Sequence, residues 1–471
     1  MIEAVEIALY LATVVTAGYA ALSLIPSGNP RSTAETAALS ILLGCGILPY
    51  AMFLAAIAGV KPCRGEIIAF ETIAIATIIA ARHRRNRRRK ESPETPPSRE
   101  DDKKSPLTGN PGKHENLALA VCVLAMAAGG LVVYLHALAM PVFDIDAYAL
   151  WGLKAKAIFH EGINSPGFFH DTSLSYSHLN YPLLVPFLAS GIFAAIGHMD
   201  DSSWRAVFPL IYVGGALFTY ASLRWKLAPL PAALLTAAFV TAPSSIRWAG
   251  AGTADFTLTL MHAASIFYLV KYIAEKARGD FILAIIFTAL AAFTKNEGIP
   301  LAALNVAVLA IFLLPLPFAK RKFAVVALFA AAVATIVAPY LIWRSGVPNT
   351  HQENYTGRLL QILHKENLER LSEILKLFAM EIFNPRRWGL LWCALPLAAA
   401  FNIHAFKKKH VLAMWTILAG HLTLYILVFI ISPWPPSFLA NMALDRIILH
   451  TAPALIYLLA LHYAETPLGN R

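Results

Sequence analysis

Few charged side chains stand beside the apolar runs of this sequence, and those few are the candidates for chemistry. Asp144 and Asp146 directly follow an apolar run at 116–140, in PVFDIDAYALWGLKAKAIFHEG. Ionisable groups at the edge of a membrane are costly and therefore suggest a functional site. A carboxylate there can act as a general base on a hydroxyl, or hold a cation that neutralises a phosphate. The alternative is the start of a solvated loop.

Three more charged motifs lie at the ends of apolar runs. Asp255 stands in AGTADFTLTL, where it either supports a site or caps a helix N-terminus. Lys295 and Glu297 stand in TKNEG, and the lysine could instead form an internal ion pair or snorkel to the surface. Arg446, in NMALDRIILHTAP, carries a guanidinium fork suited to a phosphate, unless it only pairs with Asp445.

The elements that must position these residues are transmembrane helices. The 471 residues are 58% hydrophobic and 14% charged, and the mean hydropathy is +0.59. Soluble domains have roughly 45–50% apolar and about 25% charged residues, so a soluble enzyme is excluded. Roughly fourteen apolar segments are long enough to cross a bilayer as helices, and too long for barrel strands. We expect an all-α transmembrane bundle of about 13 spanning helices, with interfacial helices on extracytoplasmic loops.

Basic residues between the apolar runs predict the orientation. The net charge of +11 would suggest a nucleic-acid partner in a soluble protein, but here it lies in short loops and predicts cytoplasmic sidedness instead. The polar segment 82–115 opens with a run of arginines and has the composition of a disordered linker. Placing it inside puts 141–181 outside. The basic clusters at 276–278, 320–322 and 407–409 then also fall inside, as the rule requires.

One crossing is unaccounted for in this topology. Three apolar runs, 182–197, 204–222 and 228–243, separate two outer loops, and an odd number of crossings cannot return the chain. One of the three therefore does not span, and the sequence leaves open which one. Farther on, 357–384 has the spacing of an amphipathic helix on the outer membrane surface.

The chain is divided as follows. We expect a three-helix membrane region at 1–81, a basic cytoplasmic linker at 82–115, a catalytic membrane module at 116–345 that includes the loop 141–181, an extracytoplasmic loop with the amphipathic helix at 346–387, and C-terminal membrane helices at 388–471. We expect a multi-pass protein of the cytoplasmic (inner) membrane with its active site on the extracytoplasmic face.

The predicted topology brings every candidate residue to the outer boundary of the membrane. Carboxylates, a lysine and an arginine at that boundary suit a substrate with a buried tail and an anionic headgroup, such as a polyprenyl-phosphate sugar. The order of motifs resembles the GT-C superfamily of membrane glycosyltransferases, particularly the protein O-mannosyltransferase and lipid A aminoarabinose transferase group. The similar stretches are FDIDAYALWGLKAKAIF with YSHLNYPLLVP, then TADFTLTL, TKNEGIP and DRIILHTAP. The resemblance covers 116–345 well and 388–463 loosely.

The resemblance implies a polyprenyl-phosphate sugar as donor and a glycan, lipid or protein as acceptor, with inversion at the anomeric carbon. Asp144 or Asp146 would deprotonate the acceptor, and Lys295 and Arg446 would bind the donor phosphate. Asp255 would orient the acceptor or a metal. The Asp-Ile-Asp spacing departs from the adjacent acid pair of many members, so the identity of the base stays open.

Other roles follow from the same resemblance. His178, Asn180 and Tyr181 would line the sugar site or form a loop turn, and Glu297 would support the site beside the lysine. Some members use a divalent metal and others none, and no ligand set in the sequence decides between them. A secondary transporter or lipid flippase is the alternative, although transporters tend to carry inverted repeats and polar breaks near mid-membrane.

Overall fold

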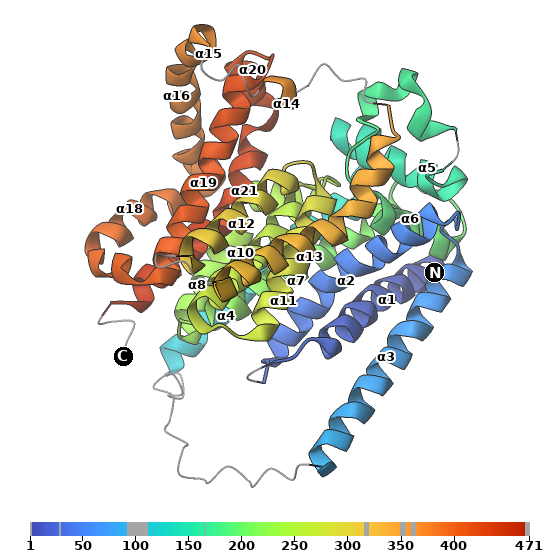
Figure 1. The fold of residues 1–471 in the computed structure, drawn as a ribbon, viewed down its shortest axis with the longest axis horizontal. Coiled ribbons are helices and arrows are strands. Elements are labelled where there is room, and N and C mark those ends of the chain that lie inside the picture. Colours follow the sequence, from blue (N-terminus) through green and yellow to red (C-terminus); the bar gives the residue numbers. More distant parts are fainter. Residues whose placement is uncertain are drawn as a thin grey trace.

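The computed structural model describes residues 2–27, 30–91, 112–164, 166–314, 320–348, 355–358 and 364–466. Every regular element in these ranges is a helix, which confirms the predicted all-α class (Figure 1). The α-helices are α1 (Ile2–Leu24), α2 (Thr33–Ile57), α3 (Arg64–Glu91), α4 (Lys113–Leu138), α5 (Leu153–Glu161), α6 (Leu184–Ile196), α7 (Val207–Leu223), α8 (Pro229–Val240), α9 (Pro243–Gly250), α10 (Asp255–Glu275), α11 (Arg278–Thr294), α12 (Gly298–Leu313), α13 (Lys320–Ser345), α14 (Tyr355–Arg358), α15 (Lys365–Glu369), α16 (Leu371–Ile382), α17 (Pro385–Trp388), α18 (Leu391–Phe401), α19 (Lys409–Ile431), α20 (Pro436–Leu439) and α21 (Asp445–Ala464).

Within these ranges, eight helices are long and apolar enough to cross a membrane. The bent pair α8 and α9, which turns through 61° at a short break, makes a ninth if it is one span. These helices agree with a multi-pass membrane protein, and the larger count of about 13 stays a prediction. Several predicted spans are shorter than expected: α6 has 13 residues, α12 has 16 and α18 has 11.

The contacts of helix α6 bear on the crossing that the sequence left open. Its 13 residues are all buried, and at about 1.5 Å per residue they reach only about 20 Å. Just beyond its C-terminal end, His198 lies 3.1 Å from Glu3, which is near the N-terminal end of α1. Just before its first residue, the carbonyl of Asn180 accepts a hydrogen bond from Tyr340, near the C-terminal end of α13. In the predicted topology both contacts lie on the outer side, which favours 182–197 as the run that does not cross, although α8 is shorter still at 12 residues and the assignment stays a prediction.

The first two helices pack closely because small residues face each other. A Cβ atom on Gly18 would lie 1.8 Å from the carbonyl oxygen of Ser40, and one on Gly44 would lie 1.9 Å from that of Val14. Only glycine allows this backbone approach, which is a common way for membrane helices to associate. Helix α1 also contacts α6, because the Tyr10 hydroxyl donates a hydrogen bond to the carbonyl of Leu188 over 2.9 Å.

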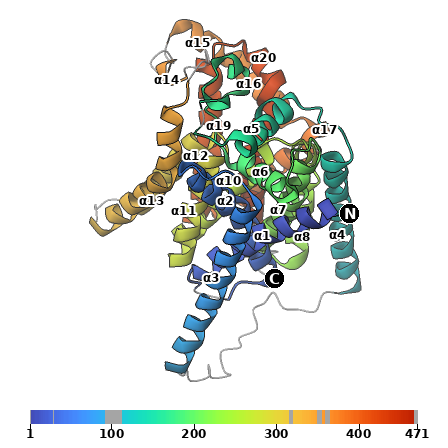
Figure 2. The ribbon, with the colours of Figure 1, turned by 90° about the vertical axis from the view of Figure 1, so that its right-hand side faces the viewer.

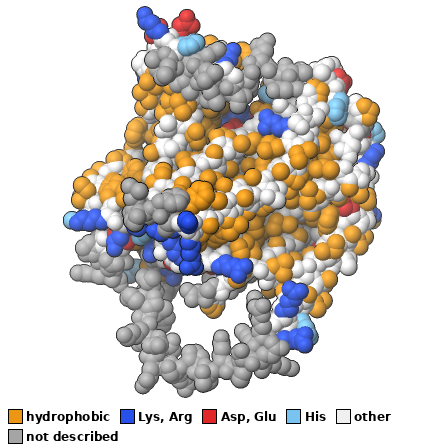
Figure 3. Space-filling model, viewed as in Figure 1, with side chains coloured by type: hydrophobic (Ala, Val, Ile, Leu, Met, Phe, Trp, Pro, Cys, Tyr) orange, Lys and Arg blue, Asp and Glu red, His pale blue; other side chains and the backbone are white. Residues whose placement is uncertain are grey.

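Helices α10 and α21 form the centre of the bundle. Over its most apolar stretch α10 is 89% buried, as is the span Pro436–Ala464 that ends with α21, whereas the buried share is 17% for α4 and 28% for α13. Figure 2 shows α10 between α4 and α13, which lie on opposite sides of the molecule. Figure 3 shows hydrophobic side chains over the middle of one face, with Lys and Arg gathered toward its lower part. Charged residues on α10 and α21 are therefore held by packed neighbours rather than by solvent.

The two ends of the bundle differ in charge and in loops. At one end, Lys276 is close enough to Lys322 and Lys409 to interact with their charges, so three predicted cytoplasmic loops converge there. We call this the basic end. The opposite end, where α10, α12 and α21 begin, is called the site end; α16 and α20 lie there, at the upper edge of Figure 1.

Two predicted boundaries differ from the structure or fall outside it. Helix α3 continues to Glu91, so the first part of the segment expected to be a linker is helical, and 92–111 lies outside the described residues. The single amphipathic helix expected at 357–384 is broken, because this segment contains the end of α14, all of α15 and α16, and α16 buries Ile374 and Phe378. Its earlier part includes 359–363, which also lies outside the described residues.

Candidate active site

An ion pair between the first acidic motif and the last helix defines the candidate site. The Arg446 guanidinium donates a hydrogen bond to the Asp146 carboxylate, and these residues are 300 positions apart. The same guanidinium nitrogen lies 3.8 Å from Asp255. Arg446 thus joins three motifs that lie far apart in the sequence. The alternative prediction, that its side chain only pairs with Asp445, is wrong, because the guanidinium contacts Asp146 and Asp255 instead.

Both partners of this pair stand next to an unusual turn. A π-helical turn, Ala147–Gly152, directly follows Asp146, and a second, Ala440–Leu444, ends one residue before Asp445 and two before Arg446. π-helical turns interrupt regular helix geometry and are frequent at functional sites. Each turn shifts the register of its helix beside the ion pair.

Asp255 is the buried centre of the group. It is the first residue of α10, and its side chain does not cap that helix, so the cap interpretation is wrong. Its carboxylate accepts a hydrogen bond from Lys295 over 2.7 Å, and the lysine lies 2.8 Å from Glu297. The lysine therefore forms the internal ion pair that was one of its two alternatives, between the end of α11 and the start of α12.

The exposure of the charged side chains shows from which side the site can be entered. The side chain of Asp146 is 30% exposed and that of Arg446 is 14% exposed, whereas Asp255 is 1% exposed. The group therefore extends from the surface of the site end into the bundle. We call it the ion-pair cluster, and its members are Asp144, Asp146, Asp255, Lys295, Glu297 and Arg446.

Asp144 differs from the other carboxylates of the ion-pair cluster. Its Oδ1 accepts a hydrogen bond from the backbone N–H of Asp146 over 3.0 Å, and it forms no ion pair within the described residues. Burial raises the pKa of Asp144 above its ordinary value, and the charge of Asp146 adds to this effect. A carboxylate with a raised pKa is the better proton acceptor, whereas Asp146 is already bound by the guanidinium.

The loop residues predicted to line a sugar site lie beside the first π-helical turn. The rings of His178 and Tyr181 have centroids 4.5 Å apart, and Tyr181 lies 6.2 Å from the ring of Trp151 in that turn. His178 has a φ of 49°, in the left-handed region that is uncommon for a residue other than glycine. Asn180 is buried, and its carbonyl binds Tyr340.

Lys154 anchors this loop, and sequence reasoning missed it. Its ammonium group is fully buried and donates to the backbone carbonyl of Ser177. It also lies 5.9 Å from the centre of the Tyr181 ring. Burial lowers the pKa of Lys154 to about 7, although the charge of Asp146 opposes this effect. A lysine two residues after the π-helical turn thus ties the loop to the segment that carries Asp146.

A second charged group adjoins the ion-pair cluster through Trp248. Asp445 accepts a hydrogen bond from the Trp248 indole over 3.1 Å and lies 3.5 Å from Arg247 and 3.6 Å from Arg387. Arg446 stands over the Trp248 ring at 5.4 Å, and Arg247 stands over it at 4.7 Å. Two guanidinium groups outside the cluster therefore reach its edge.

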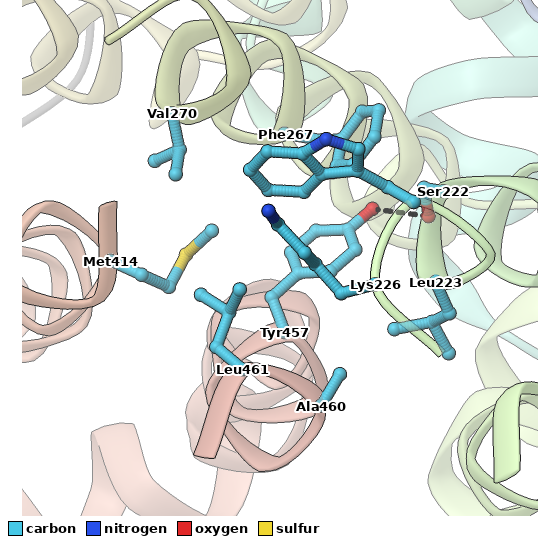
Figure 4. Close-up of a pocket in the computed structure, with 10 residues that line it drawn as sticks. Ser222, Leu223, Lys226, Phe267, Val270, Met414, Tyr457, Ala460 and Leu461 are labelled. Carbon is cyan, nitrogen blue, oxygen red and sulfur yellow. Dashed lines mark hydrogen bonds between the residues drawn. The ribbon is translucent and has the colours of Figure 1, made fainter. Parts of the chain in front are cut away.

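An apolar groove lies near this second group. It has a volume of about 680 Å³ and is lined by residues of α8, α18 and α21, by the α8–α9 junction and by Trp388 and Gly389. Arg387, the neighbour of Trp388, pairs with Asp445. A smaller crevice at the basic end, between Ser222, Phe267 and Tyr457, holds only about 10 Å³, about the space of one water (Figure 4). Neither space is lined by a member of the ion-pair cluster.

The candidate site holds no preformed metal site within the described ranges. No group of three or more His, Cys, Asp or Glu side chains in these ranges converges as metal ligands would. Asp255, which the resemblance offered as a metal ligand, is instead paired with Lys295 and faces Arg446. We therefore assign no metal to these residues.

Sequence reasoning also missed the polar neighbours of Asp255 inside the bundle. His450 Nε2 lies 3.3 Å from Asp255 Oδ1, and the Tyr425 hydroxyl lies 2.8 Å from His450 Nδ1. A signal was present, because His450 follows Arg446 by four positions and so lies on the same face of its helix.

Comparison with known proteins adds no relative. No family model, no curated protein and no solved structure matches the chain. The functional assignment therefore depends on the geometry of the ion-pair cluster, the charged group around Trp248 and the apolar groove.

Proposed function

We propose that the protein is a membrane glycosyltransferase that moves a monosaccharide from a polyprenyl-phosphate donor to an acceptor hydroxyl. The observation that carries the proposal is the ion-pair cluster itself. Residues from four distant segments meet at one end of the bundle, and two cations lie among acids that are otherwise expensive to keep there. The order of these motifs resembles the GT-C superfamily.

The roles follow from the contacts. Asp144 is the general base, because its pKa is raised and no cation of the described residues is paired with it. It takes the proton of the acceptor hydroxyl as the acceptor oxygen forms its bond to the anomeric carbon. The bond from that carbon to the phosphate oxygen breaks, and the polyprenyl phosphate leaves with the electron pair. Lys295 and Arg446 stabilise the charge that develops on the phosphate.

Arg446 must be released from Asp146 for this to happen. Arg446 is bound to Asp146 at the more exposed side of the ion-pair cluster, where an incoming headgroup arrives first. A phosphate that displaces Asp146 gains a bidentate partner, because the guanidinium presents a planar fork. Asp255 is buried and keeps Lys295 in place while this exchange occurs.

The apolar groove supports a donor with a lipid tail. Trp388, which lines it, is one residue from Arg387, which pairs with Asp445, the residue preceding Arg446. A hydrocarbon chain in the groove would therefore lie close to guanidinium groups, as a prenyl phosphate requires. A nucleotide sugar has no tail to occupy such a groove.

The proposed sidedness is extracytoplasmic, in the cytoplasmic membrane. It is supported by the convergence of Lys276, Lys322 and Lys409 at the basic end, opposite the site end. Short basic loops favour the cytoplasmic side, so the ion-pair cluster would face outward.

The test measures release of free polyprenyl phosphate. Purified protein in nanodiscs is mixed with a panel of polyprenyl-phosphate sugars and a crude envelope fraction as acceptor. We expect wild type and Arg386→Gln to release polyprenyl phosphate from at least one donor, and Arg446→Gln to lose at least a hundredfold in rate. Arg386 is the matched control, since it is an exposed arginine outside the cluster. Equal rates in both variants would contradict the role of Arg446.

A transporter or flippase is the second candidate, and one observation favours it. Buried polar side chains continue from Asp255 into the interior of the bundle through His450 and Tyr425. Such chains are typical of transport pathways. No release from any donor, combined with movement of an intact lipid-linked sugar across proteoliposomes, would favour this candidate and overturn the enzyme proposal.

A further inference from the structure

A buried arginine lies beside the ion-pair cluster without belonging to it. Arg205 stands in the short helical turn Ser203–Ala206 that leads into α7. Its guanidinium donates to two backbone carbonyls, to that of His136 over 3.2 Å and to that of Met140 over 2.5 Å. His136 belongs to the last turn of α4, and Met140 follows the end of that helix. Arg205 therefore binds the chain four residues before Asp144.

A guanidinium is a costly side chain to bury at this position. Its desolvation is offset only where its donors are satisfied, and the buried Nε of Arg205 has no hydrogen-bond partner within the described residues. The last carbonyls of a helix lack partners in the helix and carry partial negative charge. A water or a neutral side chain could bind one such carbonyl at lower cost. A planar fork can hold two carbonyls at a fixed spacing, and this distinguishes arginine from those groups.

The acidic motif that follows Met140 is held weakly by its own side chains. Residues 141–144 form no regular helix. Phe143 and Ile145, which stand beside the acids, are 67% and 64% exposed, so they do not pack the motif against the bundle. The Asp144 carboxylate accepts from the backbone N–H of Asp146, which is a bond within the motif itself. The bond from Arg205 therefore holds the start of a motif that these two side chains leave unpacked.

The stem of Arg205 packs on the segment that carries the other acid, Asp255. A Cβ atom on Gly252, three residues before Asp255, would lie 3.3 Å from Cδ of Arg205 and 3.2 Å from Cβ of Ala147. Ala147 directly follows Asp146. Gly252 has a φ of 82°, a conformation that favours glycine, and the absence of a side chain there lets the segments approach this closely. Arg205 thus contacts both acidic segments of the cluster.

The two acidic segments must lie at a fixed separation. One guanidinium nitrogen of Arg446 bonds Asp146 and also lies 3.8 Å from Asp255. A single nitrogen can face both carboxylates only while the two chains keep their relative positions. Displacement of a reacting group by about 1 Å can lower a rate by about 100-fold. A side chain that fixes both segments would therefore act on the whole cluster.

We propose that Arg205 is a positioning residue that sets the separation of the two acidic segments, so that Arg446 can face Asp146 and Asp255 together. Its fork holds two carbonyls at the end of α4, and its stem packs on the chain before α10. It touches no substrate. Its effect on catalysis rests on the proposed function, whereas its effect on the ion-pair cluster does not.

A double-mutant cycle between Asp146 and Arg446 tests this effect without any substrate. Asp146→Asn, Arg446→Gln and the double variant are unfolded reversibly in mixed micelles. The coupling is the amount by which the double variant loses less stability than the two single variants together. The cycle is repeated in proteins that carry Arg205→Gln or Arg224→Gln. Arg224 is the matched control, because it directly follows α7 at the basic end and also donates to a backbone carbonyl, that of Leu227.

We expect the coupling in Arg224→Gln to equal that in wild type, and the coupling in Arg205→Gln to fall by more than about half. Arg205→Lys keeps the charge and loses the fork, so its coupling should lie between these values. A purely structural role would lower the stability of Arg205→Gln and leave the coupling as in wild type, which would overturn the proposal. If Arg205→Gln does not fold, Arg205→Lys takes its place, and unchanged coupling there overturns the proposal equally.

The release of polyprenyl phosphate separates this inference from the proposed function. Arg205→Lys should lower the rate of release by about 10-fold to 100-fold, and Arg224→Lys should leave it unchanged. No release by wild type from any donor would contradict the proposed function, and the coupling would still decide the role of Arg205. Normal release by wild type together with unchanged coupling in the Arg205 variants would overturn this inference alone.

Discussion

The buried pair of Lys295 and Asp255 should be the most costly place in the molecule to remove one charge. The lysine ammonium lies 2.7 Å from Asp255 and 2.8 Å from Glu297, and its side chain is 9% exposed. Lys295→Met keeps the length of the side chain and removes its charge, which leaves two carboxylates without their shared cation. Breaking a buried ion pair in this way costs about 3–5 kcal/mol.

A double-mutant cycle separates this charge effect from lost packing. In Lys295→Met with Asp255→Asn, the buried carboxylate is removed together with its cation, so we expect the loss to be smaller than the sum of the two single losses by about 1–3 kcal/mol. The control is Lys271→Met at the basic end, where Lys271 lies 3.4 Å from Asp280 and is 21% exposed. Because the side chain of Lys271 is more exposed to solvent than that of Lys295, we expect the smaller loss in this control.

The assay is reversible unfolding of the purified protein in mixed detergent micelles, followed by circular dichroism. The free energies of unfolding of wild type, the two single variants, the double variant and the control are compared under one condition. A loss in Lys295→Met no larger than that in Lys271→Met would refute the reasoning. Strict additivity of the two single changes would refute it as well.

Three further predictions concern the base, the loop and the groove. Asp144→Asn should lower kcat by about 10²–10⁴. Because only the ionised base works, the acid limb of the wild-type rate profile should lie above the ordinary aspartate pKa. Asp146→Asn removes the carboxylate that the phosphate must displace from Arg446, so it should mainly lower KM, and equal kcat losses in the two variants would contradict this assignment. Burial lowers the pKa of Lys154 to about 7 in the folded protein, whereas an unfolded lysine has a pKa of about 10.4. Between these two pH values the unfolded state binds one proton more than the folded state. The free energy of unfolding should therefore rise with pH by up to about 1.4 kcal/mol per pH unit. Lys154→Met should lack that rise in chemical unfolding, and an unchanged slope would contradict the buried charge. Ala394→Trp should fill part of the apolar groove and raise KM for long-chain donors more than for short-chain donors. The control is Leu124→Trp on the exposed face of α4, which should leave KM unchanged for both. If KM of Ala394→Trp depends on chain length as in wild type, the groove does not bind the donor tail.

The fold class followed from composition, because runs of apolar residues this long leave only helices to satisfy the backbone. The sequence also predicted that the three basic loops share one side, and Lys276, Lys322 and Lys409 do converge at one end of the bundle. Which of the three apolar runs fails to cross could not be predicted from the sequence. The residues of α6 are as apolar as those of a span, and its length of 13 residues and the contacts at its two ends appear only in the fold.

The sequence predicted the candidate site only as separate motifs. Charges at span ends marked Asp146, Asp255 and Arg446, but their pairing depends on the packing of α10 against α21, which no single motif encodes. Asp144 and Asp146 could not be told apart, because the difference between them is one guanidinium from a helix 300 residues later.

The buried side chains of His262, His421, Tyr425 and His450 did leave a trace in the sequence. His421 and Tyr425 are four residues apart, as are Arg446 and His450, and His262 follows Asp255 by seven. Each pair lies on one face of its own helix, within segments that are otherwise apolar. Polar residues at helical spacing inside a span are therefore a signal that sequence reasoning could use, although which helices face one another would still require the fold.

The central claim is that the ion-pair cluster transfers a sugar rather than moving a lipid-linked sugar through the membrane. The most direct measurement counts both products in sealed proteoliposomes that carry a polyprenyl-phosphate donor with a labelled sugar in the leaflet at the site end. The account predicts one polyprenyl phosphate released for each sugar that appears on the acceptor, with both products lost together in Asp144→Asn. Labelled donor that reaches the opposite leaflet intact, with no polyprenyl phosphate released, would contradict it.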